Sequence, residues 1–483
     1  MTGLRLRLLL GVAVLLGAGS AQADDLRSAL VSAYQTNPTL AAARENQKAT
    51  DESVNIAKAP GLPSLSGTAS FTDFVKKSAN SFTSPDRALD VQANLSIPVY
   101  SGGAVKNSVR AAETRVKAGQ ADLRGSESGL FSQVVAAYLD VISNEAIVGL
   151  GQHNVDVLGV SVQSTRDRFE IGDLTRTDVA QSQSRLAVAR SNLRLQRANL
   201  AAAREKYIQL VGHAPMTLEA PPPLPGMPAS ADEAIQSALD NNPDLIASRI
   251  RSKAAGYDAD AAGAGRLPKV SLFSGVDYTD YMGTLGAGTV PAGTLSQKTT
   301  TAQAGVRVNI PIFSGGLPAA QQRQARAREG AALDQEIGVE RTVIAAVRSA
   351  YSQWQAAGEV IGSNQQAVDA AALSLEGVRA ENSVGNRTIL DILNAEQELL
   401  NAQTNLVTAR RNAYVAGFNL LAAMGKAEAR DLGLEGGVFY DPMTNYDRVR
   451  GKFFDWDLNS APKPAATRTV DTPVQNGSIP TGK

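Results

Sequence analysis

Residues that could do catalytic chemistry are scarce in this chain. It contains two histidines, His153 and His213, and no cysteine. His153 falls inside a long predicted helix and His213 at a helix end, and neither lies at the spacing of a nucleophile or a metal ligand. The sequence also lacks a G-x-x-x-x-G-K-[ST] loop for nucleotide phosphates. We therefore predict no enzymatic activity, no catalytic residue, no metal site and no cofactor.

The polar residues with a regular spacing belong to two short turns. Thr175 stands three residues before Asp178, and Thr388 stands three before Asp391, which is the spacing of a helix capping box. A glycine lies three residues before each threonine and can take the positive φ that ends a helix; these are Gly172 and Gly385. Each turn is therefore predicted to join two helices.

The turns are part of an internal repeat. Three segments of the first half return in the second half: Ala29–Arg44 as Ala234–Arg249, IPVYSGG at 97–103 as IPIFSGG at 310–316, and IGDLTRTDV at 171–179 as VGNRTILDI at 384–392. The distance along the chain from Gly103 to Gly172 equals that from Gly316 to Gly385. We expect two copies of one supersecondary unit, residues 24–213 and 231–430.

The segments outside the repeats have their own signatures. Residues 1–23 carry Arg5 and Arg7, an apolar run and Ala21-Gln22-Ala23, which predicts a signal peptide cleaved before Asp24. Residues 214–230 are a proline-rich linker. The C-terminal tail, 431–483, turns to Pro, Thr, Ser and Gly and is predicted to be largely disordered after 458.

Charge and hydropathy exclude two further classes. The chain has 47 basic and 47 acidic residues, so no nucleic-acid partner is indicated. After residue 23 we find no run of 18 apolar residues, so we expect no transmembrane helix. A membrane crossing would therefore need strands. The missing cysteine also leaves no site for a lipoprotein acyl anchor.

Four segments have the alternation of amphipathic strands. In 87–97 the residues Leu89, Val91, Ala93, Leu95 and Ile97 alternate with polar ones. The predicted strands cover about 64–76, 87–98, 269–281 and 299–311, and the third is irregular at Phe273 and Ser274. Each has close to the ~9 to 11 residues that cross a bilayer at a tilt.

Soluble hairpins packed on helices are the alternative, but the export signal and the four matching segments favour a membrane. Four strands cannot close a barrel, and open edges are not tolerated in lipid. Two chains would give eight strands and a filled interior, whereas three would give twelve and leave room for water. We expect three chains around one polar-lined pore.

Two long helices are predicted over 103–171 and 316–384, ending at the tips 172–175 and 385–388. At ~1.5 Å per residue each reaches about 100 Å. Four shorter helices flank them, at 26–59, 174–211, 231–263 and 388–424, and in each repeat the two short ones sum to about the length of the long one. A half-length helix should therefore rise to the membrane, the long helix descend, and a second half-length helix climb back to the middle.

The repeat, the two IP-aromatic-SGG corners and the V-G-x-R-T-x-x-D-x-L turn at 384–393 together resemble the TolC family of outer-membrane export ducts, over about residues 24–430. The resemblance implies a mainly α fold with membrane β, a homotrimer whose twelve-stranded barrel sits in outer-membrane lipid, and a helical barrel in the periplasm. It also implies a passive duct served by a periplasmic adaptor protein and an inner-membrane transporter, for which we expect the ABC type.

The resemblance also assigns roles to residues. The corners between barrel and tunnel would be made by three residues in each repeat: Pro98, Gly102 and Gly103, then Pro311, Gly315 and Gly316. Arg387 would hold the tunnel shut through Thr177 and Asp178 on the neighbouring hairpin. Asp391 would form a ring of carboxylates. This sequence departs from the family at two positions, with Asn382 in place of a gate tyrosine and Asn394 in place of a second aspartate.

Three functions stay open. We favour a duct for unfolded protein in type I secretion, because the acyl-anchor cysteine is missing, with small toxic molecules as further cargo. A duct for small molecules only is the alternative, and a periplasmic coiled-coil adaptor is a weaker one. A free-standing porin fits poorly, because porins are nearly all strand.

Overall fold

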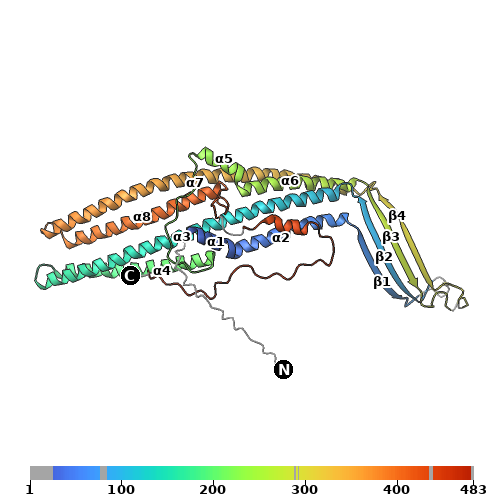
Figure 1. Ribbon diagram of the computed structural model, residues 1–483, viewed down its shortest axis with the longest axis horizontal. Helices are drawn as coiled ribbons and strands as arrows, with labels where there is room; N and C mark the ends of the chain where they lie inside the picture. The colour runs from blue at the N-terminus through green and yellow to red at the C-terminus, as the bar shows by residue number, and fades with distance from the viewer. Residues whose placement is uncertain (1–24, 77–83, 288–289, 292, 435–438, 480–483) are drawn as a thin grey trace, which may run out of the picture.

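The computed structural model describes residues 25–76, 84–287, 290–291, 293–434 and 439–479. In these residues, long helices run along the molecule and one sheet stands at its end (Figure 1). The predicted signal peptide lies outside the described residues. The fold class is confirmed, since the order helix, two strands, long helix, helix occurs twice.

The elements of the first repeat are α1 (Leu26–Thr36), α2 (Pro38–Lys58), β1 (Ser64–Asp73), β2 (Arg87–Tyr100), α3 (Ala104–Glu170) and α4 (Arg176–Val211). Those of the second are α5 (Ala231–Asn241), α6 (Pro243–Gly263), β3 (Lys269–Asp280), β4 (Lys298–Asn309), α7 (Leu317–Ser383) and α8 (Ile389–Ala423). α9 (Pro442–Val449) follows. α3 and α7 each have 67 residues, or about 100 Å.

The first short helix of each repeat is broken, where the sequence analysis expected one helix over 26–59 and one over 231–263. The break falls at Asn37-Pro38 and at Asn242-Pro243. Proline disfavours the helical conformation in the residue before it and is accepted at the first position of a helix. Each asparagine therefore ends one helix and caps the next.

The same asparagines join the half-length helices end to end. Asn37 Nδ2 donates to the carbonyl of Leu210 at 3.0 Å, near the end of α4. Asn242 Nδ2 donates to the carbonyl of Ala423 at 2.9 Å, at the end of α8. α2 continues the line of α4, and α6 that of α8, so each pair lies beside a long helix. This is the geometry expected from the helix lengths.

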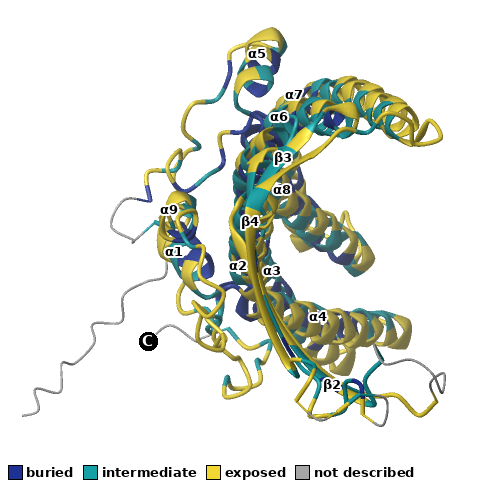
Figure 2. Ribbon diagram, turned by 90° about the vertical axis from the view of Figure 1, so that its right-hand side faces the viewer, coloured by how far each residue is buried: buried dark blue, intermediate teal, exposed yellow. Residues whose placement is uncertain are grey.

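The strands form one antiparallel sheet in the order β1-β2-β3-β4. β1 and β4 are its edges: β1 pairs only with β2 and β4 only with β3, so the outer side of each has no strand partner among the described residues. The sheet and the long helices form a curved wall, with α1 and α9 on its convex side (Figure 2).

The largest core lies where the half-length helices meet. Its fully buried large side chains include Phe131, Tyr138, Leu200, Tyr207 and Phe418, from α3, α4 and α8. α3 also corrects the expectation that no segment after residue 23 could pass for a membrane helix. Of the described helices it alone has an 18-residue stretch apolar enough to do so. Half of that stretch is buried in this fold, so the core explains its composition.

The linker and the tail are held to the helices. Three tyrosines donate to linker carbonyls: Tyr138 to Glu219 at 2.7 Å, Tyr414 to Pro222 at 2.9 Å and Tyr351 to Ala229 at 3.2 Å. Burial raises the pKa of Tyr414 to about 12. Within the tail, which is predicted to be largely disordered, residues 475–478 form hydrogen bonds with α4.

Candidate functional site

The tips of the two helical hairpins have the same construction. α3 and α7 are followed by Gly172 and Gly385, whose φ values are +82° and +84°. Thr175 then caps α4, with Thr175 N donating to Asp178 Oδ2 at 2.9 Å and Asp178 N to Thr175 Oγ1 at 3.3 Å. Thr388 and Asp391 make the same pair of bonds, at 2.9 and 3.2 Å. Both predicted capping boxes are therefore present.

The capping bonds act on the charge of the aspartates. Hydrogen bonds from the side chain and backbone of Thr175 lower the pKa of Asp178. Hydrogen bonds from the backbone and side chain of Thr388 lower the pKa of Asp391, and Arg387 adds to this effect. A carboxylate that accepts such bonds is stabilised in its ionised form. Each tip thus carries an anionic carboxylate at the N-terminus of a helix, where the helix dipole also favours it.

Arg387 lies against its own hairpin in this chain. Its Nε pairs with Glu381 Oε2 at 2.6 Å, and the hydrogen bond with Glu381 is the main reason that the pKa of Arg387 is raised. Among the described residues no bond joins Arg387 to Thr177 or Asp178. Asn382, the residue that replaces the expected tyrosine, donates from Nδ2 to the carbonyl of Arg387 at 2.7 Å. It therefore braces the turn that carries the arginine.

The two hairpins of one chain meet behind the tips. Leu393 of α8 is 2% exposed and packs with four residues of the other hairpin, Leu158, Val162, Leu186 and Ala189. Beside this cluster, Arg185 Nη2 donates to Asn394 Oδ1 at 2.8 Å. Asn394 is thus engaged within the chain.

The sequence analysis missed Arg185 and Glu381. No local pattern marks Arg185, because its partner lies 209 residues away. Glu381 is six residues from Arg387, and the sequence predicts the turn between them but not which side chains the turn brings together. The departure from the family at Asn394 was a usable signal, since an amide there can accept a bond from an arginine without being charged.

The corner residues lie where the strands give way to the long helices. Gly102 and Gly103 have φ values of +67° and +89°, and Gly315 and Gly316 have +61° and +80°. At Gly102 a Cβ would also lie 2.8 Å from Leu267 Cβ, so glycine is required there for space as well. Gly103 and Gly316 are the N-cap residues of α3 and α7.

The two corner prolines are placed differently. Pro98 lies inside β2, where pairing with β3 goes on to Tyr100 after a shift of register. The proline therefore does not end the pairing at this corner: the ladder continues past it through an irregularity, which is where strands tolerate proline. Pro311 follows the end of β4 at Asn309.

The sheet has one mainly apolar and one mainly polar face. Residues opposite each other in the ladder share a face. The rows of the apolar face are Gly67–Ala93–Val276–Ala302, Ala69–Val91–Tyr278–Thr300, Leu65–Leu95–Ser274–Ala304 and Ile97–Leu272–Val306, and the row at the loop end is Phe71–Leu89–Asp280–Lys298. The polar rows between them are Ser66–Asn94–Gly275–Gln303, Thr68–Gln92–Asp277–Thr301 and Ser70–Asp90–Thr279–Thr299.

The irregular third strand has a local explanation. Phe273 pairs with Gly305, and a Cβ on that glycine would lie 3.0 Å from the Phe273 ring. The ring covers the glycine, and the Arg307 guanidinium lies 4.9 Å from the ring centroid. Phe273 therefore belongs to the polar face, where it makes a cation–π contact with Arg307.

Comparison with known proteins places the chain among outer-membrane proteins. Residues 29–213 and 234–426 match the family described as outer membrane efflux protein. The chain is 34% identical over 435 residues to the outer membrane efflux protein BepC of Brucella suis biovar 1 (strain 1330), covering 90% of this chain and 92% of that protein. It is 26% identical over 494 residues to the outer membrane protein TolC of Escherichia coli (strain K12), covering 98% and 99%.

Two further matches concern cargo and fold. The alkaline protease secretion protein AprF of Pseudomonas aeruginosa PAO1 is 28% identical over 284 residues, covering 57% of either chain. The CmeC outer membrane channel of Campylobacter jejuni has a solved structure that superposes with a TM-score of 0.72 at 16% identity, covering 88% of this chain and 89% of that one. The structural match supports the fold alone.

Proposed function

Since the chain belongs to the outer membrane efflux protein family, we propose that three copies build one passive exit duct of a tripartite export system, which conducts unfolded secreted protein out of the cell. The observation that carries the proposal is the four-stranded sheet with one mainly apolar face and two edge strands, β1 and β4, whose outer sides have no strand partner in the described chain.

Family membership gives the location of the protein and its general role. The protein is a channel of the cell outer membrane with its helices in the periplasm, and it is not an enzyme. Proteins of this kind work in tripartite systems with an adaptor and an inner-membrane transporter. Energy for export therefore comes from that transporter.

The trimer follows from the unpaired edges. A lipid-exposed edge strand leaves backbone N–H and C=O groups without partners, each at a cost of several kcal/mol. Pairing β4 of one chain with β1 of the next removes every edge once the ring closes. Three chains give twelve strands, and the polar rows then line a lumen wide enough for water. The apolar rows face lipid.

The tip residues are proposed as the gate. Arg387 locks its hairpin to Thr177 and Asp178 of the neighbouring hairpin, and Asp391 contributes to a ring of carboxylates. Two observations support this assignment: all four residues lie at the exposed end of the helices, and the ion pair with Glu381 uses Arg387 Nε, leaving both Nη atoms available among the described contacts. Opening requires the adaptor to pull the hairpins apart.

The cargo is proposed as unfolded protein, delivered by an ABC-type transporter and its adaptor. The relative named for alkaline protease secretion supports this reading. A duct for small molecules only is the second candidate, and the relative named as an efflux protein, which is 34% identical, favours it.

A deletion strain separates the two cargoes. Loss of a secreted protein from the medium, restored by the intact gene, supports the secretion duct. Normal secretion together with increased sensitivity to toxic small molecules contradicts it and supports the efflux duct. A variant with Val276→Arg on the apolar face serves as a control for assembly.

A further inference from the structure

A buried arginine of α4 finds two of its hydrogen-bond acceptors in the C-terminal segment. Arg204 is 9% exposed. Its Nη2 donates to Glu145 Oε1 on α3 at 2.7 Å, and its Nη1 donates to the carbonyls of Asn476 at 2.7 Å and Ser478 at 3.1 Å. A buried guanidinium is costly without acceptors for its donors. The main chain of residues 476–478 therefore completes the surroundings of this side chain.

The same segment fits closely against the helix backbone. A Cβ on Gly477 would overlap the carbonyl group of Arg197, so only glycine allows this approach. On one side, Gln475 N donates to Glu205 Oε1 at 2.9 Å. On the other, Ile479 packs against the main core of the protein. Residues 475–479 are thus held by hydrogen bonds, shape and apolar contact.

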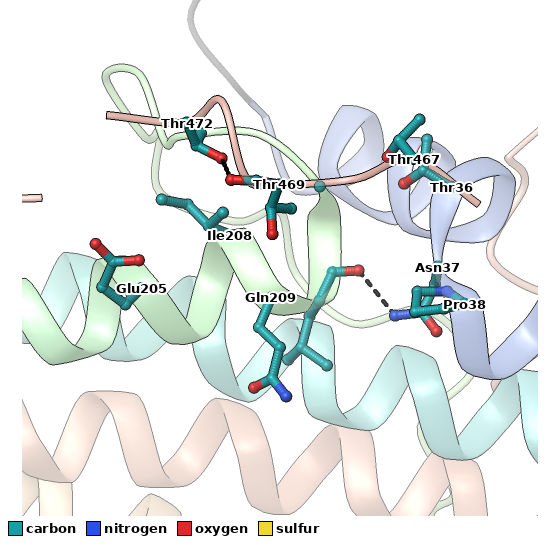
Figure 3. Close-up of a pocket in the computed structure, with 11 residues that line it drawn as sticks. Thr36, Asn37, Pro38, Glu205, Ile208, Gln209, Thr467, Thr469 and Thr472 are labelled. Carbon is teal, nitrogen blue, oxygen red and sulfur yellow. Dashed lines mark hydrogen bonds between the residues drawn. The ribbon is translucent and has the colours of Figure 1, made fainter. Parts of the chain in front are cut away.

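The chain between α9 and this segment crosses the junction of the half-length helices. Thr467, Thr469 and Thr472 roof a cavity of about 320 Å³, with Asn37 and Gln209 on the opposite wall (Figure 3). The crossing is loosely packed, because the cavity lies beneath it, whereas its two ends are fixed. At the α9 end, Asn445 Nδ2 donates to the buried Asp51 at 2.7 Å. The segment from α9 to residue 479 is therefore attached at both of its ends, and we call it the strap.

We propose that the α3/α4 hairpin carries a binding site for an extended peptide, and that residues 475–479 of the same chain are its occupant. Arg204 and Glu205 form hydrogen bonds with the peptide backbone, and the Arg197 carbonyl leaves room only for glycine at the middle position. The occupied site lies on α4 at Arg204 and Glu205, next to the α2/α4 junction that residues 467–472 cross. The inference concerns the chain's own tail and is independent of what the duct transports.

Cross-linking tests the placement in the full-length protein. The chain has no cysteine, so Glu205→Cys with Gln475→Cys gives a defined pair for a short bismaleimide. We expect cross-links within one chain, seen as a monomer with a closed loop on denaturing gels. Adding Gly477→Ala should reduce the yield at least tenfold, whereas Gly451→Ala, where a Cβ meets nothing within 4 Å, should not. Cross-links between chains, or a yield that Gly477→Ala leaves unchanged, would overturn the proposal.

A labelled peptide of residues 471–479 tests the site itself. It should bind the full-length Gly477→Ala protein, whose own strap is released, at least tenfold more tightly than the wild type, whose site is filled. Adding Arg204→Gln should weaken that binding at least tenfold, because hydrogen bonds from a charged donor are lost. Equal binding to wild type and Gly477→Ala would show that residues 475–479 do not occupy the site.

Discussion

Arginine at Val91 should impair assembly of the protein, whereas arginine at the adjacent Gln92 should be tolerated. Val91 pairs with Ala69 and Tyr278 on the apolar face and is 41% exposed in the single chain. Gln92 pairs with Thr68 and Asp277 on the opposite face. An arginine at Gln92 would therefore face water and a carboxylate, and one at Val91 would face lipid.

The position of Val91 in the strand sets the magnitude. β2 spans Arg87–Tyr100, so Val91 lies about 2 to 3 residues from its middle, or about 6 Å from the bilayer midplane at ~3.3 Å per residue and a tilt of ~40°. Arginine costs about 2–4 kcal/mol at the midplane and about 0–1 near the interfaces. We expect about 1–3 kcal/mol for each chain. Val276, nearer the middle of the sheet, should cost more.

The assay compares the amount of trimer in outer-membrane fractions by unheated gel electrophoresis. Since every trimer carries three substitutions, Val91→Arg should leave less than a tenth of the wild-type trimer, while Gln92→Arg stays within twofold. Arginine at Val306 should resemble Val91, and arginine at Gln303 should resemble Gln92. Equal losses on both faces would refute the assignment of the faces.

Further predictions concern the tips. Arg387→Ser should leave folding and trimer yield unchanged, because the ion pair of Arg387 is exposed. It should raise the single-channel conductance in planar bilayers. Unchanged conductance together with a loss of trimers would show that the arginine is structural. Arg185→Ala removes the hydrogen bond to Asn394, worth about 0.5–1.5 kcal/mol. It should raise the open fraction of the channels as much as Asn394→Ala does, with no further rise in the double variant. Additive effects would show that the two residues are uncoupled. Asp391→Asn should weaken cation selectivity, so the reversal potential measured in a salt gradient should move toward zero. An unchanged reversal potential would show that Asp391 does not line the ion path. Hydrogen bonding lowers the pKa of Asp178 and Asp391 from 3.8, so the stabilisation by the caps is complete above that value and is lost as pH falls through the lower folded pKa. Hydrogen exchange at the tips should therefore be no faster at pH 5 than expected from pH 7. Helix fraying already at pH 5 would contradict the capping role.

Local and periodic features could be predicted from the sequence. The repeat fixed the order of elements, and the alternation around Val91 identified both faces of β2. The capping boxes were visible because a threonine and an aspartate three residues apart suffice to form them. The break at Asn37-Pro38 was equally local and was missed, because the apolar pattern continues through it.

Contacts between distant segments could not be predicted. The bond from Arg185 to Asn394 depends on how two hairpins cross, and the strap on Arg204 depends on where an irregular tail runs. Phe273 interrupts the alternation of apolar and polar residues in its strand. The explanation is Gly305, the glycine opposite it on another strand, which the pattern of one strand does not show. Such features depend on tertiary packing, which a one-dimensional pattern does not carry.

The number of chains in the conducting particle tests the central claim most directly. Native mass spectrometry of the detergent-purified protein, on the same sample that forms channels in planar bilayers, should give three chains. A ring of three pairs β4 of each chain with β1 of the next and leaves room for water, whereas a ring of two would have a filled interior. A conducting particle with one chain or two would contradict the account.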